Sequence, residues 1–331
     1  MKPVVGLIIG ATLLNLTVSS VHAAEELTHI KVGHMVALDM APLFVAKESG
    51  CFTRQGLDVE TVFFANPGDN NAALAGGAID FSINAFTLPF FAANSGVPIR
   101  VISAAGGWGI MEVVAQAGLG LHSIADLKTY IQQHPGKRLK IATLQGDTLE
   151  LILDRQFAKN GIDPKSVQLV YFNDLLGMVE AFRSGQVDIL SHIKPYTTDL
   201  EVNKGSTVLT NNAQTWSLHA PNTVVSVLDK TLTQRAPVVR KFLSGLICGA
   251  DIINKHPDQA VSYLDKGHYF RVSPAVLSQA FKSAPAPISF TPDLASIQSV
   301  VDDMAKLGYI KGGVRAEDIF RLDMIRSLEK K

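Results

Sequence analysis

The two segments that decide the fold are residues 73–81, ALAGGAIDF, and residues 181–189, AFRSGQVDI. In each, a helix ends at glycine, one residue follows, and a strand begins with an apolar–Asp–apolar triplet. Glycine is common just past a helix because it adopts the left-handed backbone, so any tight helix-to-strand turn can produce this pattern. The repeated sequence pattern still predicts that the chain has two parts of similar construction.

Outward from these segments, short apolar strands alternate with helical stretches. This order predicts right-handed βαβ units and mainly parallel sheets covered on both faces, which is an α/β fold. The first cycle has expected strands at 30–33, 57–64, 79–83 and 99–104 and helices at 42–48, 70–75 and 87–94. The second has strands at 139–142, 167–172 and 187–191 and helices at 148–159 and 175–184.

The remainder is a strand at 223–228 followed by a helical tail, in which Ser273-Pro274 and Thr291-Pro292 each predict a helix start. We expect the chain to cross between the two parts near Gln116–Gly120, which is glycine-rich, and to return near His219–Asn222. The first lobe is then discontinuous, formed by residues 24–117 and 222–331, and the second lobe is formed by residues 118–221.

The N-terminus has the three parts of a secretory signal. Lys2 precedes an apolar run over residues 4–18, and Val21-His22-Ala23 places small residues at a cleavage site. The run is short for a membrane span, which needs about 20 residues, although an uncleaved anchor or a buried helix is the alternative. We expect residues 1–23 to be a cleaved signal peptide without lipid attachment, and the mature chain to be periplasmic.

Composition restricts the partners and the redox chemistry. The chain has 30 basic and 30 acidic residues, and this balance argues against a nucleic acid or a membrane surface as partner. Cys51 and Cys248 are the only cysteines. They can pair in an oxidising compartment, but two distant cysteines make no disulfide framework, and two unpaired thiols are expected.

Motifs for catalysis or for cofactors are missing from the sequence. Its histidines and cysteines lack the spacing of zinc sites, and there is no nucleophile elbow, phosphate loop or dinucleotide fingerprint. Gly106–Gly109 is rich in glycine, but no helix with a later acidic partner follows it. We therefore expect a binding protein without metal or cofactor.

Polar loops follow the expected strands, at the sheet edge where open α/β sheets bind ligands. Residues 145–148 also open a helix, whose free N–H groups are suited to hold a ligand oxygen. The candidate ligand-binding residues are His34, Met35, Asp39, Met40, Gly68, Asp69, Asn70, Asn84, Trp108, Gln145, Gly146, Asp147, Thr148, Asn173, Lys194 and Trp216.

Each candidate also has a structural interpretation. Asp69 or Asn70, and Asp147 or Thr148, are good helix N-caps and would then serve their own helices. Trp108 is alternatively a core residue, and Trp216 is alternatively a residue with a structural role only. His34 and Lys194 are alternatively solvated surface residues.

Several stretches resemble a known family. They are VGH at 32–34, APLFVAKESGCF at 41–52, GLDVE at 56–60, GAIDF at 77–81 and GQVD at 185–188. Together they resemble the nitrate/taurine/alkanesulfonate group of ABC substrate-binding proteins, whose fold also resembles that of thiamine-pyrimidine synthases. The resemblance implies a type II periplasmic binding fold with two lobes and a hinge, a monomer that delivers solute to an inner-membrane permease, and a binding role by position for the strand-end residues above.

The sequence indicates the class of ligand less directly than it indicates the fold. Asp39, Asp69 and Asp147 at the expected rim argue against a bare small anion. We expect a sulfonate, taurine, pyrimidine or aromatic acid, with an apolar body set against Trp108, Met35, Met40 and Phe86. The alternatives are an enzyme like the synthases, which needs a cysteine-rich iron site that this sequence lacks, and a binding subunit that feeds a sensor.

Overall fold

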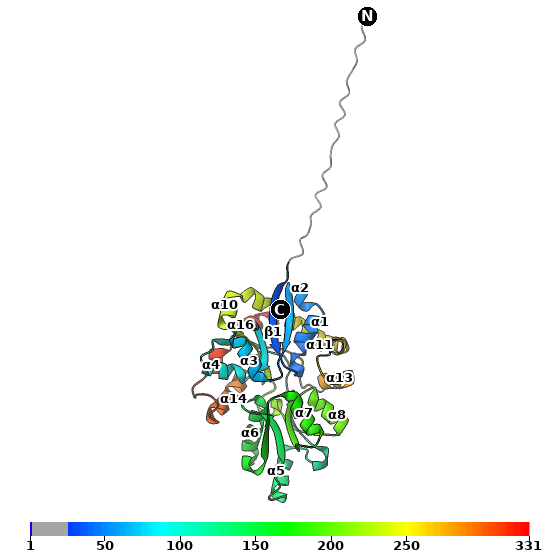
Figure 1. The fold of residues 1–331 in the computed structure, drawn as a ribbon, viewed down its shortest axis with the longest axis vertical. Coiled ribbons are helices and arrows are strands. Elements are labelled where there is room, and N and C mark those ends of the chain that lie inside the picture. Colours follow the sequence, from blue (N-terminus) through cyan, green and yellow to red (C-terminus); the bar gives the residue numbers. More distant parts are fainter. Residues whose placement is uncertain (2–25, 331) are drawn as a thin grey trace.

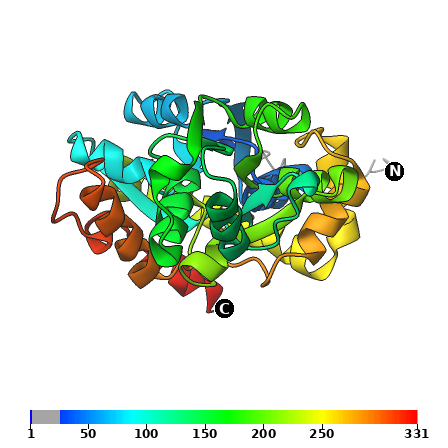
Figure 2. The ribbon, with the colours of Figure 1, turned by 90° about the horizontal axis from the view of Figure 1, so that it is seen from below.

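The computed structural model describes Met1 and residues 26–330, and the described chain forms two α/β lobes arranged along its long axis (Figure 1). The predicted signal peptide lies, apart from Met1, outside the described residues. Each lobe is built on a five-stranded sheet with helices on both sides (Figures 1 and 2). The predicted α/β class and the type II periplasmic binding architecture are confirmed.

The first lobe combines an N-terminal and a C-terminal part of the chain. The N-terminal part contains β1 (Thr28–His34), η1 (Leu38–Met40), α1 (Ala41–Glu48), α2 (Cys51–Arg54), β2 (Leu57–Phe63), α3 (Pro67–Ala75), β3 (Phe81–Ala85), α4 (Leu88–Asn94) and β4 (Ile99–Ala104). The C-terminal part contains β10 (Thr223–Leu228), α10 (Asp229–Gln234), α11 (Ala236–Lys255), α12 (Pro257–Lys266), α13 (Pro274–Lys282), α14 (Leu294–Lys306), α15 (Ala316–Ile319) and α16 (Asp323–Glu329).

The second lobe is formed by the middle of the chain. It contains β5 (Met111–Ala115), η2 (Ala117–Leu119), α5 (Ile124–Gln133), β6 (Lys140–Leu144), α6 (Thr148–Asn160), η3 (Pro164–Ser166), β7 (Gln168–Phe172), α7 (Leu175–Arg183), β8 (Ile189–Ile193), α8 (Tyr196–Lys204), β9 (Thr207–Asn211) and α9 (Asn212–Thr215).

The two sheets share one topology. The first runs β2-β1-β3-β10-β4 and the second β7-β6-β8-β5-β9, with the fourth strand antiparallel to both neighbours in each case. Each antiparallel strand is the first to follow a crossing, β5 after β4 and β10 after β9. The like construction that the repeated segments predicted is therefore present, and each sheet is mainly parallel, as expected, with one antiparallel strand.

The first crossing lies earlier than expected. Because β5 pairs with β8 and β9, the chain has already entered the second sheet at Met111, and the crossing falls at residues 105–110 instead of Gln116–Gly120. The prediction missed β5 because residues 111–115 were assigned to the first lobe, before the expected crossing, and no strand was expected there. The chain returns to the first sheet between β9 and β10.

Glycine-rich sequence at the first crossing is explained by backbone geometry. Gly106 and Gly109 have positive φ angles of 129° and 62°, a region that favours glycine. A Cβ atom on Gly109 would also clash with Pro285. The two crossings lie together, since Trp108 forms an isolated antiparallel bridge with Pro221 of the return segment.

Helix starts follow capping chemistry, with two differences from expectation. α3 begins at Pro67 behind an Asn66 cap, whose side chain accepts from Gly68 N, so the helix starts three residues before the expected Asn70. Asp293 caps α14 by accepting from Ala295 N, so Thr291-Pro292 precedes this helix and does not open it. The Ser273 cap of α13 is confirmed.

Cys51 and Cys248 form a disulfide, and the expectation of two unpaired thiols is wrong. α11 packs on α1 and α2, which brings the two Cα atoms to 6.0 Å across 197 residues of sequence. Gly245 permits this approach, because a Cβ atom there would clash with the ring of Phe52. Sequence spacing could not reveal the pair, since the contact depends on helix packing.

We expect removal of this disulfide to lower the free energy of unfolding by about 2–4 kcal/mol, because a cross-link over a long loop restricts the unfolded chain. The measurement is denaturant unfolding of the native protein and of a Cys51→Ser/Cys248→Ser variant. Adding reductant should destabilise the native protein and leave the variant unchanged. Two thiols that react in denatured, unreduced protein would contradict the pairing.

Hydrophobic helices of membrane-spanning length are not found among the described residues.

Candidate ligand-binding cleft

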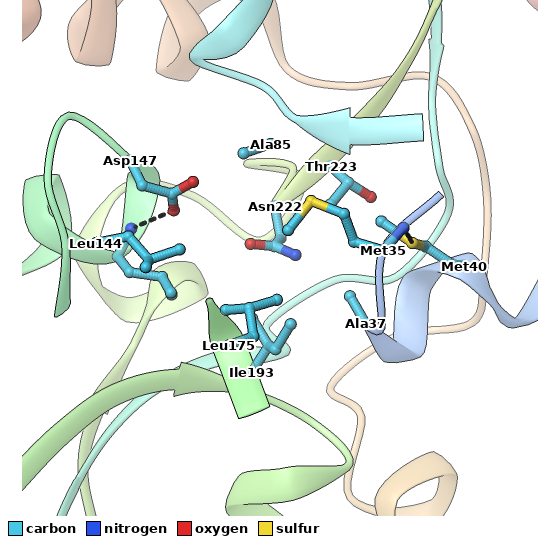
Figure 3. A pocket seen from close by; sticks show the side chains of 11 residues that line it. Met35, Ala37, Met40, Ala85, Leu144, Asp147, Leu175, Ile193, Asn222 and Thr223 are labelled. Atoms are coloured by element: carbon cyan, nitrogen blue, oxygen red, sulfur yellow. Dashed lines mark hydrogen bonds between the residues drawn. The ribbon is translucent and has the colours of Figure 1, made fainter. Parts of the chain in front are cut away.

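A narrow cavity of about 20 Å³ lies between the lobes, and side chains of both lobes line it (Figure 3). This volume is about the room that one water molecule needs. The first lobe and the return crossing contribute Met35, Ala37, Met40, Ala85, Asn222 and Thr223, and the second lobe contributes Leu144, Asp147, Leu149, Leu175 and Ile193. We call this the inner cavity.

A larger space of about 300 Å³ adjoins the inner cavity. Leu144 and Asp147 line both spaces, so the two lie side by side. We call the second space the outer cavity and the two together the cleft. Its volume reaches the lower end of the range for small-molecule pockets. Its other lining residues are Asn66, Pro67, Gly68, Leu88, Phe91, Gln145, Gly146, Phe172 and Asn173.

Asp147 is the N-cap of α6, as the capping interpretation predicted. Its Oδ1 accepts from Leu149 N at 3.0 Å and from Thr148 Oγ1 at 3.0 Å. The side chain is buried, and burial raises the pKa of this carboxyl to about 6. Figure 3 shows its other oxygen directed toward the space between the lobes.

The first turn of α6 has few free N–H groups. Gly146 N donates to Glu150 Oε2 at 2.6 Å, and the amides of Glu150 and Leu151 donate to the carbonyl of Asp147. With Leu149 N bound to the Asp147 side chain, these donors are already satisfied inside the protein. The expectation that this turn offers free N–H groups to a ligand oxygen is therefore largely wrong.

Asp39 lies behind the wall on the first-lobe side. Its Oδ2 accepts from Thr223 N at 3.0 Å, Thr223 Oγ1 at 2.6 Å and Asn222 Nδ2 at 3.3 Å. Burial raises the pKa of the Asp39 carboxyl to about 6, and these hydrogen bonds oppose the rise. Asp39 therefore holds the return crossing in place and fixes two of the residues that line the inner cavity.

Several polar contacts join the lobes around the cleft. Tyr309 of the C-terminal part donates to Glu150 Oε2 at 2.6 Å, and Arg155 of α6 pairs with Asp303 of α14 at 2.6 Å. At the opposite rim, Leu38 N donates to the carbonyl of Lys194 at 2.9 Å. The described conformation is therefore one in which the lobes are in contact.

The two cationic candidates, Lys194 and His34, line neither the inner nor the outer cavity. Lys194 is buried, pairs with Glu112 at 3.1 Å and donates to Ser283 at 2.9 Å. His34 lines a separate cavity, whose other lining residues are Val36, Phe63, Leu176, Tyr196, His268, Tyr269 and Arg271. Burial lowers the pKa of His34 to about 4, which leaves its imidazole neutral at pH 7.

Seven of the sixteen predicted ligand-binding residues come together in the cleft, and the other nine line neither cavity. Those in the cleft are Met35, Met40, Gly68, Gln145, Gly146, Asp147 and Asn173. Outside it, Asp39, Asn70, Asn84, Trp108, Thr148, His34 and Lys194 are buried, Asp69 is exposed and Trp216 is half-buried.

The buried residues outside the cleft serve the fold. Asn70 donates to the carbonyl of Ile83 and accepts from Ser82, and Asn84 donates to the carbonyl of Pro67. Trp108, expected as a pocket wall, has no exposed surface and donates to Ser289 Oγ at 3.0 Å. Phe86, also expected against the ligand, is buried and lines neither cavity.

Sequence reasoning missed the apolar residues that the second lobe contributes to the cleft. Leu144 and Ile193 are the last residues of β6 and β8, and Leu175 begins α7. They lie at the strand ends that were searched, but only polar residues and glycine were selected at the strand ends of this lobe. Asn222 and Thr223 were missed because the return crossing was regarded as a connector.

Groups of three or more His, Cys, Asp or Glu side chains arranged to hold a metal ion are not found in the part of the chain that the structure describes.

Comparisons with known proteins agree with this architecture. The putative binding protein YtlA of Bacillus subtilis is 20% identical over 287 residues, which are 86% of this chain and 84% of YtlA. The bicarbonate-binding protein CmpA of Synechococcus is 26% identical over 213 residues, which are 59% of this chain but only 47% of CmpA.

The nitrate-binding protein NrtA of Synechocystis PCC 6803 has the same fold, with a TM-score of 0.77 at 18% identity, over 92% of this chain and 89% of the NrtA chain. The model of the family described as "NMT1/THI5 like" matches residues 37–260, more than half of the sequence. The chain belongs to the NMT1/THI5-like family.

Proposed function

We propose that this protein is the periplasmic solute-binding component of an ABC importer and that it is not an enzyme. The observation that carries the proposal is the cleft itself, because residues of both lobes line each of its two adjoining cavities. A ligand that contacts both lobes favours the closed state over the open one. The similarity to CmpA, a bicarbonate-binding protein, and to NrtA, a nitrate-binding protein, supports a solute-binding role.

Hinge motion at the two crossings is the proposed mechanism. The inner cavity is almost closed in the described conformation, so an organic solute enters when the lobes separate. Closure then surrounds it, and a membrane permease recognises the closed form. The Cys51–Cys248 disulfide supports a periplasmic location, since such bonds persist in oxidising compartments.

The solute proposed is a small organic molecule with an apolar part. Met35, Met40, Leu144, Leu175 and Ile193 supply apolar walls on both sides of the inner cavity. Met35 and Met40 were expected from the sequence, whereas Leu144, Leu175 and Ile193 take the place of the expected Trp108 and Phe86.

The direct test is mass spectrometry of small molecules released from the purified, denatured protein. We expect one organic solute at a near-stoichiometric amount, and small-angle scattering should show a more compact protein when that solute is added back. Absence of any bound or re-bound molecule, with unchanged scattering, would contradict the proposal.

Tyr309→Phe should weaken the binding of that solute about tenfold, which corresponds to about 1.4 kcal/mol. The substitution removes a hydrogen bond between the lobes to buried Glu150, and this shifts the population toward the open state. Calorimetry and scattering on the same samples measure both effects.

Tyr171→Phe is the matched control. Tyr171 donates to Glu150 Oε1 at 2.6 Å from within the second lobe. The Tyr171→Phe variant therefore removes one hydrogen bond from the same carboxylate but leaves the contacts between the lobes in place. Equal effects of the two variants would show that Tyr309 does not act through closure.

A further inference from the structure

The cleft has one charged side chain in its lining, and that side chain is acidic. Among the described residues that line the inner and outer cavities there is no Lys, Arg or His, and Asp147 is shared by both cavities. Lys194 is held by Glu112 and Ser283. A bound anion would therefore lie beside a carboxylate without a cation to compensate.

Backbone donors do not replace the missing cation. Anions bind at helix N-termini because N–H groups there lack partners. In α6, Gly146 N is bound to Glu150, Leu149 N to the Asp147 side chain, and two further amides to the Asp147 carbonyl. Of the amides of residues 146–151, only that of Thr148 is left without a partner inside the protein, and a single N–H group does not replace a cation.

A second acceptor faces Asp147 from the other side of the inner cavity. The side-chain amide of Asn222 donates through Nδ2 to Asp39 Oδ2, and Asp39 accepts also from Thr223. Since a carboxylate accepts hydrogen bonds, the nitrogen of Asn222 must face Asp39. Its Oδ1 is then left on the cavity side, and Figure 3 shows it directed toward Asp147 and Leu144.

From this arrangement we infer that the solute presents a nitrogen with two or more N–H groups, such as an ammonium, an amidinium or an amino-heterocycle, to Asp147 and Asn222. This inference rests on the proposed function and specifies its ligand class. The nitrogen would bridge acceptors on opposite sides of the cleft, and the apolar body would lie against Met35, Leu144 and Ile193. Bridging also explains how such a group favours closure.

The test compares cationic or N–H-rich probes with anions on related skeletons. Unfolding temperature and calorimetry are measured with benzamidinium, benzylammonium and 2-aminopyridine, and then with benzoate, phenylmethanesulfonate, nitrate and bicarbonate. We expect at least one of the first three to raise the unfolding temperature, and none of the anions to do so.

Asp147→Asn should weaken binding of the responding probe at least tenfold. Asparagine is also a good N-cap, so α6 should remain folded. Asp69→Asn is the matched control, because Asp69 is exposed on α3 and lines neither cavity, and it should leave binding unchanged.

The outcomes separate this inference from the proposed function. If an anion raises the unfolding temperature and none of the three N–H-rich probes does, the inference is overturned, while the proposed function as a solute-binding protein still stands. Equal binding by wild type and Asp147→Asn also overturns it. The proposed function fails separately, when no probe of either set binds and no small molecule co-purifies.

Discussion

Trp108→Ala should lower the free energy of unfolding by about 3–5 kcal/mol, the range for truncating a large buried aromatic side chain. The indole has no exposed surface, donates to Ser289, and meets the ring of His219 edge-on at 5.1 Å. It therefore joins the first crossing to both the return segment and the C-terminal part. Denaturant unfolding followed by circular dichroism measures the change.

Trp216→Ala serves as the comparison. Trp216 is half-buried and follows α9 in the return segment, so its truncation should cost less. If Trp108→Ala left stability unchanged and weakened only ligand binding, the indole would return to the set of ligand-binding residues that the sequence predicted.

Glu112→Gln should cost about 3–5 kcal/mol of unfolding free energy, because it leaves the Lys194 ammonium buried without a counter-charge. The two side chains are only 6% and 3% exposed and are joined at 3.1 Å. Glu112 also accepts from Thr197. Thermal and denaturant unfolding give the change, and a Glu112→Gln/Lys194→Met variant should recover part of it.

Asp251→Asn is the control for a surface pair. Asp251 and Lys255 are 56% and 66% exposed, and pairs of this kind contribute at most about 1 kcal/mol. Similar losses in the buried and the exposed pair would show that Lys194 does not need Glu112.

Most of the fold could be predicted because it is encoded locally. Strand β10 has the bounds expected from the sequence, and α6 was expected within one residue of its observed end. Apolar periodicity and capping residues determine such elements. β5 and the disulfide could not be found in this way, because both depend on which distant segments become neighbours.

The location of the cleft could be predicted from the sequence, but only some of the residues that line it could. The strand-end loops pointed to the edge of both sheets at which the cleft lies, and Gln145–Asp147 line the outer cavity there. The sequence did not show which polar side chains would form hydrogen bonds within their own lobe and so would not face the cleft. Asn70 and Asn84 bind the backbone of their own lobe, and this depends on side-chain direction, which spacing alone does not give.

The position of β10 has a consequence for the order of assembly. This strand fits between β3 and β4, yet it comes from residues 223–228 of a chain of 331. While the chain is being synthesised or exported, β3 and β4 have no partner between them, and their open edges are liable to pair with other chains. The second lobe, by contrast, has all its strands by residue 211. It can therefore complete its sheet first, while the sheet of the first lobe stays incomplete until residues 223–228 have been synthesised.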